Sequence, residues 1–249
     1  MVALVETGRT RARRPETAEV RLGSARALLV TVPERTVKRP RRLSRACRAA
    51  AAMAKDAGAS AVCFREDFPG RALFDGSGLR ELSERPLLER TAADVLALSS
   101  PEGVCAAVFC GAVTENVKRT VQTLTGSFRY VLLCTASCRA GLVREVGERL
   151  GASIAENETM LETADAAVFF EPPPRAVRLP AACAALFLTG ARPENVSGGK
   201  TIASVRFAAP PRLEEALPEG YPRGALLAYL ASAGVPGAEA IRPVSLTSE

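Results

Sequence analysis

The sequence predicts an α/β fold in which a doubly wound, mostly parallel sheet lies between two layers of helices. Short apolar runs alternate with amphipathic stretches of helical length, most regularly between Gly103 and Pro172. Each connection in that segment is long enough to hold a helix, so neighbouring strands should be parallel with right-handed crossovers. These observations together indicate a three-layer domain with about six to eight strands.

The segment from Gly103 to Pro172 supplies the clearest elements. Thr114 is placed to cap a helix that ends near Leu124, because the apolar residues between them fall on one stripe. A second helix is expected over residues 141–150. Runs rich in Val, Ala and Phe are typical of strands covered on both faces, and they predict strands at Val104–Cys110, Tyr130–Cys134, Ala152–Ala155 and Ala166–Phe170.

Further elements are expected on both sides of this segment. Apolar runs predict strands that begin near Ala27, Ala59, Ala184 and Ile202. Helical spacing predicts helices over residues 40–57, 86–98 and 221–233, and a helical turn at 79–82.

The domain organisation follows from these elements. Residues 1–24 carry four arginines between two short β-prone pieces and are expected to form a basic arm or an edge hairpin. Residues 25–208 are expected to form a single domain, with a possible sub-boundary near 99–103. Residues 209–249 are expected to be a loop and a helix that pack on this domain.

Ligands of parallel sheets bind at the carboxyl ends of the strands, near the point where the strand order reverses. The loops at these ends are Gly111–Thr114, Thr135–Gly141 and Glu171–Pro174. In the N-terminal half, Glu66 and Asp67 follow a predicted strand and are the natural carboxylates for a site there.

The order of elements resembles that of a known domain type. A strand, Gly111, a helix, the strand YVLLC, a loop with Arg139, a helix, LGAS and then ADAAVFFEPP resemble the Rossmann-like NAD(P)-binding domains of shikimate dehydrogenases and glutamyl-tRNA reductases. The resemblance implies an NADP-like cofactor, held at Gly111, Thr114, Thr135, Ser137 and Arg139. Arg139 would suit a 2′-phosphate.

The glycine pattern departs from that of the resembling family. G-x-G-x-x-G aligns with residues 111–116, where Gly111 alone matches. Val113 stands where the backbone must approach a pyrophosphate, and no acid follows the second strand to hold a ribose. A scaffold whose cofactor site is eroded or absent is therefore the alternative.

The most basic stretch lies between Arg35 and Arg48 and contains no acid. Cations at a helix N-terminus oppose the helix dipole by about 0.3–1 kcal/mol each, whereas an anion is bound readily there. The candidate anion-binding residues are Arg39, Arg41, Arg42 and Arg45. They indicate a phosphorylated ligand or nucleic acid, and a solvated basic face is the alternative.

The composition excludes several function classes. The chain has no histidine, so His-based catalytic triads and His-ligated metal sites are excluded. The seven cysteines lie mostly in apolar patterns and form no C-x2-C pair, which predicts buried free thiols and no metal site. Cys138, in a ligand-facing loop, is the one candidate for a reactive thiol. The N-terminus lacks the pattern of a secretory signal and no apolar run could span a bilayer, so we expect a cytoplasmic protein.

Three hypotheses for function remain. The first is a non-enzymatic or catalytically reduced module that binds a protein partner or regulates one. The second is an enzyme or sensor that binds an NADP-like or other phosphorylated small molecule. The third is a protein that associates with nucleic acid through Arg35–Arg48.

Overall fold

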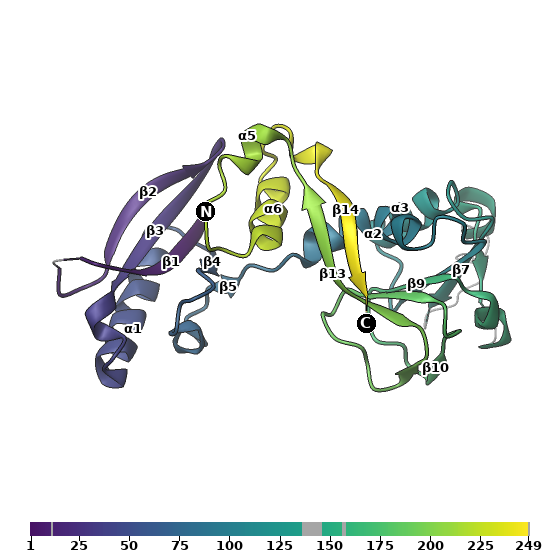
Figure 1. Ribbon diagram of the computed structural model, residues 1–249, viewed down its shortest axis with the longest axis horizontal. Coiled ribbons are helices and arrows are strands. Elements are labelled where there is room, and N and C mark those ends of the chain that lie inside the picture. The colour runs from purple at the N-terminus through teal and green to yellow at the C-terminus, as the bar shows by residue number, and fades with distance from the viewer. Residues whose placement is uncertain (11, 136–145, 156–157, 249) are drawn as a thin grey trace. The chain divides into compact units, whose positions relative to one another are not determined.

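The computed structural model describes residues 1–10, 12–135, 146–155 and 158–248. The chain forms two compact units (Figure 1). Unit 1 comprises Met1–Glu84 and Ala209–Ile241, and unit 2 comprises Arg85–Ala208 and Arg242–Glu249. Each unit has its own main sheet.

The expectation of a single domain over residues 25–208 is therefore corrected. The chain passes from unit 1 to unit 2 at Glu84–Arg85, not near residues 99–103. The first sheet ends there because its last strand, Arg80–Glu81, is short, charged and exposed. Residues 99–103 instead join a helix to a strand within unit 2.

The sheet of unit 1 has the strand order β2-β3-β1-β4-β5. The strands β1, β3, β4 and β5 are parallel, and β2 forms an antiparallel hairpin with β3. Their bounds are β1 (Val2–Gly8), β2 (Glu16–Leu22), β3 (Ala25–Pro33), β4 (Ala61–Phe64) and β5 (Arg80–Glu81). Residues 1–24 are thus only in part an edge hairpin, because β1 lies at the centre of the sheet. Its run Val2–Val5 is apolar at every position and is buried on both faces.

Helices cover both faces of this sheet. Helix α1 (Pro40–Asp56), preceded by η1 (Glu34–Thr36), packs its small apolar residues on the face that carries Val5, Val30 and Phe64, and η2 (Arg71–Phe74) extends that core. The C-terminal segment covers the opposite face, where the Tyr229 hydroxyl donates a hydrogen bond of 3.1 Å to the carbonyl of Arg26. This segment contains α5 (Pro211–Glu214), α6 (Arg223–Ser232) and η4 (Ala238–Ala240).

The main sheet of unit 2 has the strand order β14-β13-β11-β9-β6-β7-β8. Only β14 runs antiparallel to its neighbour within the described sheet. Numbered along the chain, the parallel strands lie in the order 3-2-1-4-5-6, which is the order of the Rossmann fold. The bounds are β6 (Cys105–Cys110), β7 (Tyr130–Thr135), β8 (Ser153–Ile154), β9 (Ala166–Phe169), β11 (Ala184–Phe187), β13 (Lys200–Ala208) and β14 (Arg242–Ser248).

Two layers cover the sheet of unit 2. Helices α2 (Arg85–Ser99) and α3 (Glu115–Leu124) pack side by side on one face (Figure 1). The other face carries η3 (Glu158–Thr163) and the small parallel pair β10 (Val177–Arg178) and β12 (Val196–Ser197). On this second face Phe109, Phe169 and Phe187 stack across neighbouring strands, with ring centroids 4.1 and 4.8 Å apart.

The predicted α/β class with mostly parallel strands is confirmed, as is each predicted strand. The helical turn expected at 79–82 is wrong, because β5 pairs with β4 there. Residues 209–249 are divided: the helices belong to unit 1, and β14 is an edge strand of unit 2. Of the helix predicted over 141–150, residues 146–150 are helical and the rest lie outside the described residues.

Candidate functional site

The strand order of unit 2 reverses between β6 and β9, and we call the space at their carboxyl ends the switch point. From β6 the chain continues to β7 on one side and later returns to β9 on the other. The pairs Ala106–Ala166 to Phe109–Phe169 set the register of the two strands. This register places Gly111 beside Glu171, each two residues beyond the last pair. Rossmann-type sheets bind their ligands at this position.

The backbone of Gly111 lies directly against the carboxylate of Glu171. A Cβ atom at position 111 would overlap Oε2 of Glu171, which is the far end of an exposed, flexible side chain and would have to move aside. The carbonyl of Gly111 accepts a hydrogen bond of 3.2 Å from the hydroxyl of Thr135, at the end of β7. Gly111 is thus fixed from two sides, and the carboxylate occupies the space next to its Cα.

Helix α3 begins at the switch point with an acid. Thr114 is its N-cap, and the Thr114 hydroxyl accepts a hydrogen bond of 3.4 Å from the backbone N–H of Val117, as predicted from the sequence. Glu115 follows in the first turn and pairs with Nζ of Lys118 at 3.4 Å. The positive end of the helix dipole is therefore already faced by a carboxylate.

Polar residues of helix α2 also lie near the switch point. Arg85 donates to the carbonyl of Phe170 at 3.3 Å and to Oε1 of Glu89 at 2.7 Å. The other carboxylate oxygen of Glu89 accepts a hydrogen bond of 3.1 Å from the side-chain amide of Asn116. The guanidinium and the amide are thus held by protein groups before any ligand arrives.

Glu171 differs from these neighbours because it is exposed and unpaired. Over the described part of the chain, neither a cation nor a hydrogen-bond donor pairs with its carboxylate. Glu89 pairs with Arg85 and Glu115 pairs with Lys118, so among these residues Glu171 carries the uncompensated charge. A cradle for pyrophosphate needs free N–H groups and cations instead.

The thiols of this region are held in the neutral form. Burial raises the pKa of Cys110 to about 11; a hydrogen bond with Thr135 lowers it, and the charge of Glu171 raises it further. Burial raises the pKa of Cys134 to about 12. Neither residue has the exposed thiolate that a nucleophile requires. The prediction of buried free thiols is confirmed for every described cysteine except Cys134, which is half-buried.

The structure brings three of the predicted cofactor residues together. Gly111, Thr114 and Thr135 all lie at the carboxyl ends of β6 and β7. Ser137 and Arg139 fall outside the described residues, as does Cys138. The loop that starts at Glu171 was expected to face a ligand, but Glu171 was not among the predicted site residues. Its place beside Gly111 could have been predicted by pairing the two apolar strands β6 and β9, each of which is followed by a polar loop.

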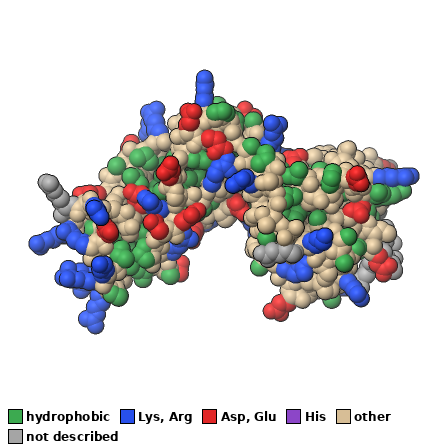
Figure 2. All heavy atoms as spheres, viewed as in Figure 1, with side chains coloured by type: hydrophobic (Ala, Val, Ile, Leu, Met, Phe, Trp, Pro, Cys, Tyr) green, Lys and Arg blue, Asp and Glu red, His purple; other side chains and the backbone are tan. Residues whose placement is uncertain are grey.

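In unit 1, the predicted anion-binding arginines lie at the start of α1. Arg39, Arg41, Arg42 and Arg45 are exposed (Figure 2 shows Lys and Arg side chains gathered at one end of unit 1). Helix α1 has Arg39 as its N-cap, without a capping side chain, and its first turn has no acid. Their role as an anion site stays a prediction.

The carboxyl ends of β1 and β4 hold a second polar cluster. Nη1 of Arg65 lies 3.6 Å from Oε2 of Glu6, and the buried Tyr221 lies 3.4 Å from the same oxygen through its hydroxyl. Burial and the charge of Glu6 raise the pKa of Tyr221, so the phenol stays neutral. The sequence pointed to Glu66 and Asp67, but both are exposed and Asp67 pairs with Arg65 at 3.2 Å. The cluster tethers residues 219–222 to the sheet: the N–H of Glu66 donates to the carbonyl of Gly220.

Within the part of the chain that the structure describes, His, Cys, Asp and Glu side chains form no group of three or more that could hold a metal ion. None of the described helices combines the length and the hydropathy that crossing a bilayer requires.

Comparison with known proteins gives distant structural likeness only. Neither a protein-family model nor a curated protein matches the sequence. A dipicolinate synthase chain from Bacillus halodurans is 10% identical over 46% of this chain and 45% of its own, with a TM-score of 0.33. The transhydrogenase from Sinorhizobium meliloti is 13% identical over 58% of this chain and 62% of its own, with a TM-score of 0.35.

D-lactate dehydrogenase with NAD+ from Lactobacillus jensenii is 12% identical over 79% of this chain and 72% of its own, with a TM-score of 0.32. This chain spans about half the length of the dipicolinate synthase chain and less than two thirds of the length of the transhydrogenase. The Rossmann-like character of unit 2 rests on its own strand order.

Proposed function

We propose that unit 2 binds a small polar ligand at its switch point, and that the ligand presents a hydroxyl or ammonium group to Glu171. One observation carries this proposal: the exposed carboxylate of Glu171, which pairs with no cation or donor among the described residues, lies against the backbone of Gly111. A carboxylate is an acceptor of hydrogen bonds and attracts cations. Nucleosides, sugars and amino acids carry the matching groups.

The same carboxylate disfavours a dinucleotide. A pyrophosphate bound at the start of α3 would lie next to Glu171 and close to Glu115, and like charges at such distances repel. The protein is then a Rossmann-like binding module whose dinucleotide chemistry is reduced. This agrees with the loss of the later glycines of the motif after Gly111.

The second candidate is an NADP-like dinucleotide, bound by an enzyme or a sensor. The strand order of unit 2 and the placement of Gly111, Thr114 and Thr135 at one edge favour it. No acid follows β7 where a ribose would be held, which suits NADP better than NAD. In this candidate Arg139 is the contact for the 2′-phosphate.

Thermal shift and titration calorimetry separate the two candidates. The panel contains adenosine, free sugars and amino acids on one side, and NADH, NADPH and ATP on the other. A ligand at about 100 times its Kd stabilises the folded protein by about 2.7 kcal/mol. We expect stabilisation by an unphosphorylated member, lost in Glu171→Ala and kept in Glu102→Ala, which removes an exposed acid from a different loop.

The opposite result would establish the second candidate. If NADPH at millimolar concentration stabilises the wild type more than every unphosphorylated compound does, the proposal for Glu171 fails. A panel in which no compound at all shifts the melting temperature would leave unit 2 a scaffold without a small-molecule site.

A further inference from the structure

A strongly basic surface covers one end of unit 1. It is made of arginines and one lysine from the β1–β2 loop, from η1 and from helix α1, and all of these side chains are exposed. We call it the basic surface, and its residues are Arg9, Arg13, Arg14, Arg35, Lys38, Arg39, Arg41, Arg42, Arg45 and Arg48.

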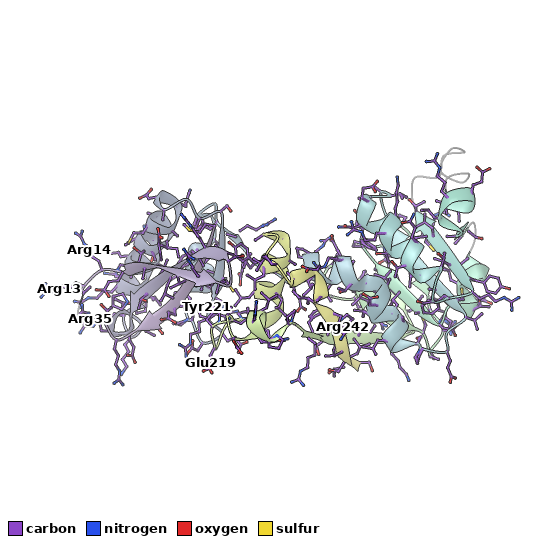
Figure 3. The ribbon with its side chains drawn as sticks, turned by 90° about the horizontal axis from the view of Figure 1, so that it is seen from above. Arg13, Arg14, Arg35, Glu219, Tyr221 and Arg242 are labelled. Atoms are coloured by element: carbon purple, nitrogen blue, oxygen red, sulfur yellow. The ribbon has the colours of Figure 1, made fainter. Side chains whose placement is uncertain are left out.

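The fold brings these segments together because β1 and β3 are parallel neighbours. Gly8 pairs with Pro33, so the loops that follow both strands leave the sheet at the same edge. Nε of Arg9 lies 3.5 Å from Oε2 of Glu34, and a guanidinium N–H of Arg35 donates to the carbonyl of Ala12. Arg13, Arg14 and Arg35 lie at the same end of unit 1 in Figure 3.

Helix α1 continues the surface as a row of guanidinium groups. Its apolar residues are buried against the sheet, so the remaining face must point outwards. Arg41, Arg45 and Arg48 stand four and three residues apart on that face, about 6 Å and about 4.5 Å along the helix axis. Phosphates of a nucleic acid strand recur about every 3.4 Å along the duplex axis, so long side chains at this spacing can reach successive or alternate phosphates.

Cations outnumber acids on this surface. Glu34 is the one acid between Arg21 and Lys55, and it pairs with Arg9. Glu16, next to the β1–β2 loop, accepts a hydrogen bond from the hydroxyl of Thr10. The helix begins with Arg39 as an uncapped N-cap and with no acid in its first turn, so these cations also oppose the helix dipole. A bound polyanion would relieve both repulsions at once.

We propose that the basic surface binds the phosphate backbone of nucleic acid without sequence selectivity. Arginine predominates in it, and its planar fork matches phosphate oxygens in pairs. Residues 9–48 contain no aromatic side chain on which a base could stack. The contact is therefore with the backbone, and it concerns a different unit from the ligand site at Glu171.

An anionic membrane is the competing polyanion, and the structure favours it less. Membrane-surface helices insert an exposed apolar face, whereas the apolar face of α1 lies in the core of unit 1. In the described part of the chain the large exposed apolar residues are Leu73, Leu98, Val104, Tyr130 and Val244, and none belongs to these segments.

Fluorescence anisotropy with a labelled duplex and a labelled single strand of arbitrary sequence tests the proposal on the full chain. The logarithm of the association constant should fall linearly with the logarithm of salt concentration, with a slope of about −0.9 per phosphate contact on the duplex. Replacing Arg41, Arg45 and Arg48 together by Gln should make the slope shallower by about 2–3 and weaken binding by roughly 100-fold at about 0.1 M salt.

The matched control replaces Arg149, Arg175 and Arg178, which are exposed arginines of unit 2, by Gln. It changes the net charge by the same amount and should leave the slope unchanged. Replacing Arg41, Arg45 and Arg48 by Lys should keep most of the slope, because the charge stays. Circular dichroism of each variant establishes that it is folded.

An association constant that does not change with salt concentration overturns the proposal. An equal loss of affinity in the control variant overturns it as well. Tighter binding to vesicles that contain phosphatidylserine than to the oligonucleotides, at the same salt, overturns the assignment to nucleic acid. Neutral phosphatidylcholine vesicles serve as the blank.

Discussion

Replacing Glu171 by Gln should allow the wild-type fold to bind a dinucleotide more tightly. Glutamine keeps the size and the polarity of the side chain but removes its charge. The backbone of Gly111 and the Thr114-capped start of α3 are left in place by this change. The variant therefore tests whether the charge of Glu171 alone prevents a pyrophosphate from binding at the switch point.

The expected gain follows from the Coulomb energy of the carboxylate and one phosphate. For the estimate we take a phosphate at the start of α3 that lies about 4 Å from the carboxylate. At that distance two unit charges repel by about 1 kcal/mol in water and by about 4 kcal/mol at the effective dielectric constant of a protein surface. This corresponds to an affinity gain of roughly 5-fold to 1000-fold. Since Glu171 is exposed, we expect a value near the lower limit.

Calorimetric titration of NADPH and NADH into wild type, Glu171→Gln and Glu102→Gln measures the gain. Raising the salt from about 0.1 M to about 1 M shortens the Debye length from about 10 Å to about 3 Å, so the difference between wild type and Glu171→Gln should shrink. Unchanged weak binding in Glu171→Gln would refute the electrostatic reasoning and would place the defect in the glycine-poor loop instead. Weaker binding than in wild type would show that Glu171 is itself a dinucleotide contact.

Four further predictions concern stability and thiol reactivity. Phe169→Ala should lower the free energy of unfolding of unit 2 by about 3–5 kcal/mol in urea titration followed by circular dichroism, because its ring is stacked between Phe109 and Phe187; a loss below about 1 kcal/mol would contradict this packing. Thr114→Ala should cost about 1 kcal/mol through the lost cap of α3 and Thr114→Ser much less, so an equal loss in both variants would argue against the cap. In a Cys138→Ala background, the native thiols should react with a disulfide reagent at pH 8 far more slowly than the denatured ones, because burial raises the pKa values of Cys47 and Cys63 from 9.0 to about 11 and about 12. The stabilisation from neutral thiols is complete below the unfolded pKa and is lost as the pH rises through about 11 to 12, so circular dichroism should report alkaline unfolding in that range.

Most of the predicted strands could be recognised because they are short apolar runs with a polar boundary. Ala166–Phe170 and Tyr130–Cys134 have this form, and their residues Ala166–Phe170 and Val131–Leu133 are buried on both faces. The number of sheets could not be predicted in the same way, since periodicity gives the type of an element but not its neighbour. The exposed pair Arg80–Glu81, too short to show alternation, closes the first sheet and so decides the division.

The centre of unit 1 was missed for a related reason. Val2–Val5 is a fully apolar run at the chain end, where an arm or a fraying edge is the usual expectation. Its burial depends on pairing with β3 and β4, which begin 23 and 59 residues later at Ala25 and Ala61. The central position of β1 therefore depends on these long-range pairs, which the local sequence of Val2–Val5 does not reveal.

Glycine at the end of the first Rossmann strand is usually explained by the approach of a pyrophosphate. In this chain the approaching group is the protein's own carboxylate, since Glu171 occupies the space that a Cβ at position 111 would need. Gly111 therefore has a close neighbour without any phosphate, and this glycine alone does not argue for a dinucleotide. In the proposed function, the carboxylate across β6 and β9, rather than the glycine motif along the chain, selects the ligand of the switch point.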